Sequence, residues 1–292
     1  MEIKEVSLKT QKYAQKTHFV LLPFGDLQVG SPLFNREVWD RYVGAVRHTP
    51  NALTIGMGDY SDHFRPSVQE RLTSAIRGYD KESLHSIQDM HRDFMDKKVV
   101  PLLKPVIANS SCLGLLAGHH DMDYNDGTNS TQYLCSQLRI PYLGRGEAIV
   151  RVNLCLSGTN PHKVLNFDIL ATHGEGTGSS VGGAVRKLKD LLPHFDVDVI
   201  LRGHSCDRFV FAEPRYGLTR THPPRLRCRN RVIANTGGFS SSRIEGVTTY
   251  VEQANMIPKA MGWVELHIRV KREGPDGANS SQKSQYIDIW DK

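Results

Sequence analysis

Histidine and carboxylate side chains gather in four short stretches of this sequence, and each stretch directly follows an apolar run. Gly118-His119-His120-Asp121 comes after the apolar residues 112–117. The other stretches are 24–28, 56–62 and 201–207. A short apolar run that ends in glycine is typical of a buried strand, and α/β proteins carry their chemistry at the carboxyl ends of such strands. We therefore predict that these stretches meet at one site.

The side chains released after these strands are ligands that divalent transition metals prefer. A lone histidine after the apolar run 164–171 adds to them. Two metal ions about 3.5–4 Å apart, joined by a bridging carboxylate, can hold the oxygens of an in-line displacement at phosphorus. Asp59 is the candidate for this bridge. The predicted ligands are Asp26, Asp59, His119, His173 and His204.

Several residues of these stretches also have a simpler interpretation when each is considered alone. Asp26 and Asp59 could cap a turn or a helix, His173 could be a buried histidine bonded to backbone, and Cys206 could belong to an ordinary strand end. Asp62 is more typical of a residue that braces the motif than of a ligand. Because the placement after a strand recurs along the chain, we favour metal binding.

In their order, the motifs resemble those of the calcineurin-like metallophosphoesterase superfamily. That family carries Asp-x-His, Gly-Asp-x-x-Asp, Gly-Asn-His-Asp/Glu, a lone histidine and Gly-His-x-His, each at a strand end. The matching stretches here are 26–28, 58–62, 118–121, His173 and 203–206. The resemblance covers about residues 18 to 240. It implies an α/β fold, a four-layer α-β-β-α sandwich in which two β-sheets face each other and helices cover their outer sides.

Three positions depart from the family pattern. Gln28 and Cys206 stand where the family has histidines, and His119 stands where it has asparagine. For the first metal the resemblance implies the ligands Asp26, Gln28, Asp59 and Cys206. For the second metal it implies the ligands Asp59, His119, His173 and His204. The second site thus gains a stronger ligand, while the first is changed at two positions.

These departures bear on the expected cofactors, which are two divalent transition metal ions. Glutamine offers only a neutral carbonyl oxygen, whereas a cysteine thiolate selects softer ions and loses its proton on binding. Mn, Zn or Fe is therefore expected rather than Mg. Asp207 is a spare ligand if the Cys206 side chain points away.

The resemblance implies hydrolysis of a phosphate ester by a metal-bound hydroxide. It assigns to His120 the protonation of the leaving oxygen, with Asp121 orienting the imidazole ring. An adjacent carboxylate favours the imidazolium form and raises its pKa, so this pairing is chemically reasonable.

Arginine is concentrated after the last motif, with eight arginines in residues 202–231 against only Asp207 and Glu213. This segment could be a solvated face of a β-hairpin. It could also be a track for a phosphate backbone that leads to the metals. We name Arg202, Arg208 and His222 as candidates for substrate contact. On this basis a phosphodiester or nucleic-acid substrate is preferred over a small monoester.

Composition narrows the class of protein. With 292 residues, 39% hydrophobic and 23% charged, the chain is ordinary for a globular protein. It has no apolar run long enough to cross a membrane and no apolar signal segment at its start, so we expect a cytoplasmic protein without a membrane partner. The five cysteines contain no C-x-x-C pair, which argues against a zinc ribbon. The net charge of +6 permits a phosphate-bearing partner. The oligomeric state stays open.

Because the candidate ligands are spread from Asp26 to Asp207, we expect a single domain over 1–292. The resemblance implies a core at about 18–240, with C-terminal strands in 241–292 that complete the sandwich. Helices are expected from near Asn35 to before Pro50, within 68–103, and at 128–138 and 184–192. The last third should be mostly β. The predicted strands are 1–8, 18–24, 52–57, 112–117, 146–156, 164–171, 197–201, 209–211, 231–234, 248–251, 263–270 and 286–290.

Taken together, the residues and the resemblance predict a metal-dependent hydrolase of phosphate esters, a phosphodiesterase or nuclease with a dinuclear metal centre. One alternative is a phosphomonoesterase that acts on a small substrate. Another is a degenerate member that binds a metal or a partner without catalysis, which Gln28 and Cys206 suggest. A structural zinc protein is disfavoured, because ligand sets rich in Asp and His are typical of open catalytic sites.

Overall fold

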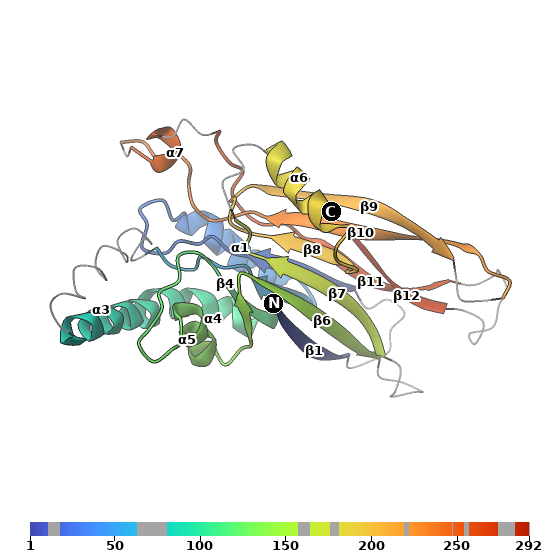
Figure 1. The fold of residues 1–292 in the computed structure, drawn as a ribbon, viewed down its shortest axis with the longest axis horizontal. Coiled ribbons are helices and arrows are strands. Elements are labelled where there is room, and N and C mark those ends of the chain that lie inside the picture. Colours follow the sequence, from blue (N-terminus) through green and yellow to red (C-terminus); the bar gives the residue numbers. More distant parts are fainter. Residues whose placement is uncertain are drawn as a thin grey trace.

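Two six-stranded β-sheets form the centre of the protein (Figure 1). The computed structural model describes residues 1–10, 18–62, 81–156, 164–175, 181–218, 222–246, 248–253, 257–273 and 284–291. The first sheet contains β1 (Glu2–Thr10), β6 (Glu147–Leu156), β7 (Val164–Thr172), β8 (Val199–Arg202), β10 (Leu226–Thr236) and β9 (Arg208–Leu218), in that spatial order. The second contains β12 (Ser284–Asp291), β11 (Leu266–Glu273), β2 (His18–Phe24), β3 (Ala52–Gly56), β4 (Ser111–Ala117) and β5 (Tyr142–Arg145).

Helices cover the outer faces of the two sheets. The described helices are α1 (Arg36–His48), α3 (Lys81–Phe94), a π-helix (Met95–Val99), α4 (Val100–Ala108), α5 (Ser130–Leu138), α6 (Val181–Leu191) and α7 (Tyr250–Gln253). Helices α1, α4 and α5 pack on the second sheet, where Trp39 and Leu103 meet Phe24. Helix α6 packs on the first sheet through Leu188. The expected order of helix, sheet, sheet and helix is confirmed.

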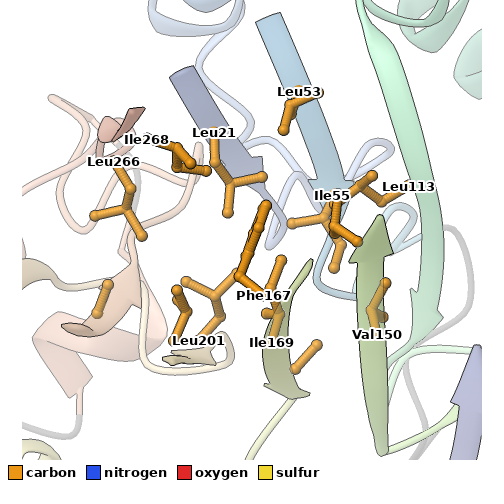
Figure 2. Close-up of a cluster of buried hydrophobic side chains, with 14 of the residues drawn as sticks. Leu21, Leu53, Ile55, Leu113, Val150, Phe167, Ile169, Leu201, Leu266 and Ile268 are labelled. Carbon is orange, nitrogen blue, oxygen red and sulfur yellow. The ribbon is translucent and has the colours of Figure 1, made fainter. Parts of the chain in front are cut away.

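The main core lies between the sheets, and strand alternation builds it (Figure 2). Successive side chains of a strand point to opposite faces. On β2, Leu21 therefore faces Phe167 of the other sheet, while Leu22 and Phe24 face the helices. All of these side chains are buried. The packing fixes the two sheets against each other and so fixes the loops at their edges.

Parallel strands place the ends of the motifs at one edge of this core. Strands β2, β3, β4 and β5 run parallel within the second sheet, and β7, β8 and β10 run parallel within the first. All of the motif-bearing loops follow the carboxyl ends of these strands. Strands β11 and β12 join the second sheet beside β2 and complete it.

Helix α1 shows how local sequence positions the elements. It begins after Asn35, whose Oδ1 accepts a hydrogen bond from the backbone N–H of Val38 at 3.0 Å. Its buried face contains Val38, Trp39 and Tyr42, at the spacing that the sequence predicts. The helix ends at His48, two residues before Pro50, as expected.

The structure corrects the predicted secondary structure in three places. Residues 248–251 do not form a strand, because Thr249 and Glu252 form a reciprocal capping box that starts α7. Strands β9 and β10 are much longer than predicted and form one hairpin. Strand β5 was not predicted, since its four residues contain a glycine and an arginine.

One prediction falls partly on residues outside the described ranges. This is the helical pattern within 68–103, over residues 68–80. Among the helices that the structure describes, none has the length and apolar character needed to cross a membrane.

Candidate metal centre

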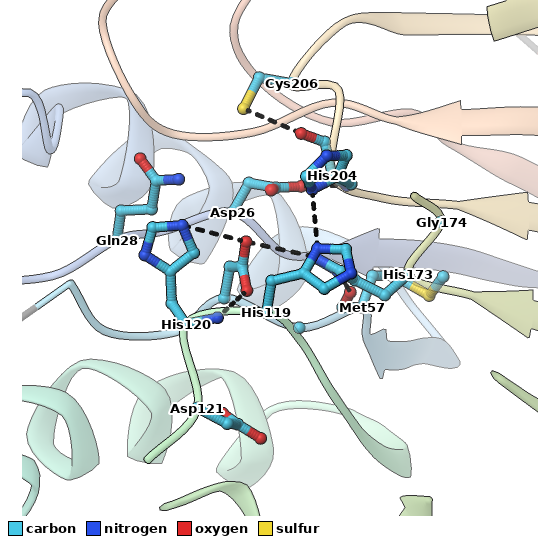
Figure 3. Close-up of polar contacts among 12 residues, drawn as sticks. Asp26, Gln28, Met57, His119, His120, Asp121, His173, Gly174, His204 and Cys206 are labelled. Carbon is cyan, nitrogen blue, oxygen red and sulfur yellow. Dashed lines mark hydrogen bonds and ion pairs between the residues drawn. The ribbon is translucent and has the colours of Figure 1, made fainter. Parts of the chain in front are cut away.

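Five predicted ligands from both sheets meet at the carboxyl edge (Figure 3). Asp26 follows β2, and Asp59 follows β3. Across the gap between the sheets, Asp26 Oδ2 accepts a hydrogen bond from the backbone N–H of His204 at 2.9 Å. His173 Nδ1 lies 2.7 Å from the carbonyl oxygen of Met57, the residue that leads into Asp59. The loops of the two sheets are therefore tied together at this edge.

Three histidines form the centre of this cluster. His119 Nδ1 and His204 Nδ1 lie 3.2 Å apart. The ring centroids of His173 and His119 are 4.8 Å apart, and those of His173 and His204 are 5.2 Å apart. One nitrogen of each ring lies within 4.8 Å of the other two. We call this set the histidine group, and its geometry can hold a metal ion.

Two carboxylates and the same His173 form a second set, which we call the carboxylate group. Asp26, Asp59 and His173 each offer one ligand atom, and these atoms also lie within 4.8 Å of one another. Asp59 Oδ2 is 3.2 Å from His173 Nε2. The two groups therefore share one histidine.

Burial and neighbouring charges shift the pKa values of these side chains, and most of the resulting protonation states favour cation binding. Burial and the neighbouring His173 and His119 lower the pKa of His204 to about 4, and burial also lowers the pKa of His119. Both imidazoles are therefore neutral at pH 7, the form that binds metals. Burial opposes a charge on His173, but its contact with Asp59 outweighs burial and raises the pKa of His173 to about 9. Burial also works against the Asp59 carboxylate, yet His173 and His120 hold the pKa of Asp59 below its usual range.

The buried carboxylate of Asp26 is independent evidence that this site binds a cation. Its side chain is fully buried, and its Oδ1 has no hydrogen-bond partner among the described residues. Burial raises the pKa of Asp26 to about 7. A buried carboxylate oxygen without a partner is costly. A metal ion beside Asp26 would satisfy this oxygen, so the residues present fit a divalent cation.

Backbone strain is concentrated at the same loops. Five non-glycine residues of the site have φ between 50° and 67°, a region that L-residues rarely adopt. Such strain clusters at functional sites, where surrounding structure enforces it. The five are Asp26, Gln28, Asp59, His204 and Cys206. Gly118 serves close approach, because a Cβ at this position would lie 2.1 Å from Asp59 Oδ1.

His120 lies beside the cluster, and the structure corrects its expected partner. Its Nδ1 is 2.8 Å from Asp62 Oδ1, and its backbone N–H donates to Asp59 Oδ1 at 3.0 Å. Asp121 does not orient the ring. It accepts hydrogen bonds from the hydroxyls of Ser130 and Thr131 at the start of α5, and Figure 3 shows it directed away from the histidines. The bracing role expected of Asp62 is consistent with its contact to His120.

Of the three departures from the family pattern, His119 joins the histidine group, whereas Gln28 and Cys206 are engaged with other protein groups. Gln28 Oε1 accepts a hydrogen bond from Ser240 Oγ at 3.0 Å. Cys206 Sγ donates to the carbonyl oxygen of His204 at 3.9 Å, and burial raises the pKa of this thiol well above its ordinary value. Among the described residues, neither of these two side chains nor Asp207 belongs to the histidine group or the carboxylate group.

The structure removes Arg202 and His222 from the predicted substrate contacts. Arg202 is only 2% exposed, and its Nη2 donates to the carbonyl oxygen of Glu175 at 3.1 Å, so it supports the loop after β7. His222 lies in the connection between β9 and β10. Because β10 runs parallel to β8, that connection is at the opposite end of the sheet from the site (Figure 1). Arg208 starts β9 at the correct edge, exposed to solvent.

Most of the arginine-rich hairpin therefore lies far from the metal centre. From Asn235 back to Leu226, strand β10 runs nine residues away from the site, about 30 Å at about 3.3 Å per residue. Two arginines of the hairpin are engaged with nearby protein groups. Arg215 pairs with Asp196, and Arg231 donates to the carbonyl oxygen of Leu192 at 2.7 Å. Arg220 lies outside the described residues.

Sequence reasoning missed two residues beside the centre. Ser240 binds Gln28 from the loop after β10. Lys259, half-buried, donates from Nζ to the carbonyl oxygen of Ser205. Neither belongs to a motif, and Ser240 is 212 positions from its partner, so no spacing in the sequence could reveal the contact.

Comparison with known proteins gives weak similarities. No family model matches this chain, and no curated protein matches it. Three of the solved structures that are similar to this chain are the following. Vps29 from Entamoeba histolytica complexed with Zn²⁺ is 11% identical, with coverage of 93% of this chain and 98% of that chain and a TM-score of 0.37. Vps29 from Chaetomium thermophilum is 11% identical, with coverage of 94% and 97% and a TM-score of 0.32. A conserved uncharacterized protein from Streptococcus pneumoniae, described as a predicted phosphoesterase, is 14% identical, with coverage of 93% and 98% and a TM-score of 0.30.

Proposed function

We propose that this protein is a metal-dependent hydrolase of phosphate esters, of the calcineurin-like metallophosphoesterase type. One observation carries the proposal. The histidine group and the carboxylate group meet at the carboxyl edge of both sheets, beside a histidine that is paired with a buried carboxylate. Metal ligands next to a separate acid–base pair are what hydrolysis of a phosphate ester requires.

A bound divalent ion lowers the pKa of a coordinated water and draws charge from phosphoryl oxygens. The protein contributes neutral nitrogens from His119 and His204 and the ionised carboxylate of Asp59. Because imidazole ligands suit zinc and iron and are poor ligands for Mg²⁺, we propose Mn, Zn or Fe as the ion.

His120 is proposed as the general acid. Burial disfavours its charged form, but the hydrogen bond from Nδ1 to Asp62 and the charges of Asp59, Asp62 and Asp26 together outweigh burial, so that the pKa of His120 is raised. The ring therefore keeps its proton to a higher pH than a free imidazole does. With Nδ1 engaged by Asp62, Nε2 is the nitrogen that remains to protonate a leaving oxygen.

We propose a small phosphate ester rather than a nucleic-acid strand as the substrate. The preference for a nuclease came from the arginines of residues 202–231, and most of their hairpin extends away from the site. Arg208 remains as a cation at the site edge. Among the other arginines of this segment that the structure describes, none supports a track to the metal centre.

The proposal is tested by assaying the purified protein with added Mn²⁺, Zn²⁺ or Fe²⁺ against a mono-aryl phosphate, a bis-aryl phosphate and single-stranded DNA. We expect hydrolysis of at least one aryl phosphate and little cleavage of DNA. DNA cleavage as fast as aryl ester hydrolysis would overturn the substrate preference. No hydrolysis with any of the ions would overturn the enzyme proposal.

A non-catalytic metal-binding role is the second candidate. It is favoured by one observation, the engagement of Gln28 and Cys206 with other protein groups instead of with the cluster. The contact between His120 and Asp62 favours the enzyme, because a scaffold has no need of this pair. Stoichiometric metal binding without hydrolysis of either aryl phosphate would indicate the non-catalytic role.

A further inference from the structure

The histidine group and the carboxylate group cannot each hold a separate ion through His173. Its Nδ1 donates to the carbonyl oxygen of Met57 at 2.7 Å. Only Nε2 is then left to bind a metal, and one ring nitrogen serves one ion. Because Nδ1 is engaged, His173 can serve either group only through Nε2. A second ion would therefore need ligands from outside the two groups.

The residues at the positions for these additional ligands are engaged elsewhere. Gln28 Oε1 is bonded to Ser240 Oγ, and the remaining amide nitrogen has no lone pair for a metal. Cys206 Sγ is directed to the carbonyl oxygen of His204, as the dashed line in Figure 3 marks. The residues on this side of the centre do not fit a second ion.

The loop that carries Ser240 is packed tightly against this side. The backbone N–H of Phe239 donates to the carbonyl oxygen of Asp26 at 3.1 Å, and its carbonyl oxygen accepts from the N–H of Asn35 at 2.7 Å. At Gly238, a Cβ would lie 2.9 Å from the Cβ of Asp26. Because the loop is held on both sides, the bond from Ser240 to Gln28 is a fixed part of the site.

The ammonium group of Lys259 lies on the same side of the metal centre. Lys259 Nζ donates to the carbonyl oxygen of Ser205, between His204 and Cys206. An ammonium group has three N–H donors, and this bond uses one. The charge of Lys259 also acts on the Cys206 thiol. Lys259 thus places a positive charge on the side of the metal centre where the side chains of Gln28 and Cys206 are engaged with other protein groups.

We infer that the centre binds one divalent ion per chain, through ligands of the histidine group and the carboxylate group, and that Lys259 supplies positive charge to an anion on the Gln28–Cys206 side. The part that concerns Lys259 rests on the proposed function, because it takes the anion to be a phosphoryl group. The count of ions does not depend on that function.

The ion count is tested by saturating the protein with Mn²⁺ or Zn²⁺, removing unbound metal and measuring metal per chain by elemental analysis. We expect about one ion in the wild-type protein and an electron paramagnetic resonance spectrum of uncoupled Mn²⁺. The double variant Gln28→His with Cys206→His should bind a second ion and give a coupled Mn²⁺ spectrum. Two ions or a coupled spectrum in the wild-type protein would overturn the inference, whether or not the double variant folds.

The role of Lys259 is tested with inorganic phosphate as the probe, by calorimetry on the metal-loaded protein. Lys259→Met should weaken phosphate binding about tenfold, the loss of one charge-assisted hydrogen bond, and Lys259→Arg should restore part of it. The matched control is Lys189→Met, which removes an exposed lysine of α6 that pairs with Glu213 of β9. Metal content should be equal in all variants. Equal phosphate affinity in Lys259→Met and Lys189→Met would overturn the role.

The two experiments separate this inference from the proposed function. Neither the metal count nor phosphate binding requires turnover. A protein that binds one ion and phosphate but hydrolyses no ester contradicts the enzyme proposal alone. A protein that hydrolyses esters with two ions contradicts this inference alone.

Discussion

His120 Nδ1 lies 2.8 Å from Asp62 Oδ1, although 58 positions separate the two residues. The carboxylate is buried and the imidazole is half-buried, so water screens their interaction only weakly. This pair raises the pKa of His120 despite the opposing effect of burial. It is therefore the contact on which the proposed proton transfer depends.

Asp62→Asn should lower the pKa of His120, because the charge that stabilises the imidazolium is removed. A general acid works when protonated, and its activity falls as the pH rises through its pKa. We expect the alkaline limb of the kcat profile to move to lower pH and kcat at pH 7 to fall about 10–100-fold, with metal content unchanged. Asp123→Asn is the control, because Asp123 is exposed and pairs with Arg145 instead. An unmoved alkaline limb would contradict the role of Asp62.

His120→Ala should lower turnover about 10²–10⁴-fold, the usual contribution of a general acid. Bound metal should remain nearly constant, since His120 belongs to neither ligand group. Turnover and elemental analysis on the same preparation check this prediction. Loss of metal together with turnover would instead make His120 a ligand.

Removing metal should destabilise the protein, because the ion binds only where the folded chain gathers its ligands. At a metal concentration 100 times the Kd, a bound ion contributes about 2.7 kcal/mol to the free energy of unfolding. A chelator should therefore lower the Tm of the wild-type protein. His204→Ala should bind metal at least about 100-fold more weakly and show a smaller decrease in Tm on chelation. An equal decrease in both proteins would mean that His204 does not hold the ion.

Gly118→Ala should damage both stability and metal binding. The added methyl group would lie 2.1 Å from Asp59 Oδ1 and 2.5 Å from the Asp59 backbone nitrogen. Overpacking of this kind costs about 1–3 kcal/mol in free energy of unfolding. The control is Gly44→Ala in helix α1, where the structure places nothing within 4 Å of the new Cβ. That variant should be about 0.5–1 kcal/mol more stable than the wild-type protein. Denaturant unfolding measures both.

Asp198→Asn should make the protein more stable at neutral pH. Burial raises the pKa of Asp198, so the folded state favours the protonated acid more than the unfolded state does. Stability contributed by this group is therefore lost as the pH rises above the ordinary value of 3.8. An asparagine oxygen can still accept the hydrogen bond from the N–H of Asp168, which is 2.9 Å long in the wild-type protein. The Tm difference should be positive at pH 7 and vanish below about pH 4. A difference that does not change with pH would contradict the prediction.

The local patterns of the sequence were sufficient for most of the fold. Apolar runs ending in glycine predicted β2, β3 and β4, and the spacing of Val38, Trp39 and Tyr42 predicted helix α1. These predictions succeed because hydrophobic periodicity acts over a few residues. The capping box of Thr249 and Glu252 is also local, and it makes a helix of residues that were predicted as a strand.

Local sequence pattern was not sufficient to predict the long hairpin of β9 and β10. Its outer part exposes Tyr216, Leu218 and Leu226, so no buried face marks it in the sequence. Only pairing across the two strands, from Leu218 and Leu226 to Arg208 and Thr236, makes this region a sheet. The direction of β10 then decided that His222 lies far from the metal centre.

The sequence by itself determined which side chains reach the edge of the sheets, because a ligand that follows a parallel strand must emerge at its carboxyl end. Asp26, Asp59, His119, His173 and His204 could all be placed in this way. Only the tertiary structure decided the partners of the residues around them. His120 meets Asp62 rather than its neighbour Asp121, and Gln28 meets Ser240 rather than a metal. Neighbouring side chains leave the backbone in different directions, so contacts at such a site depend on how the two sheets pack.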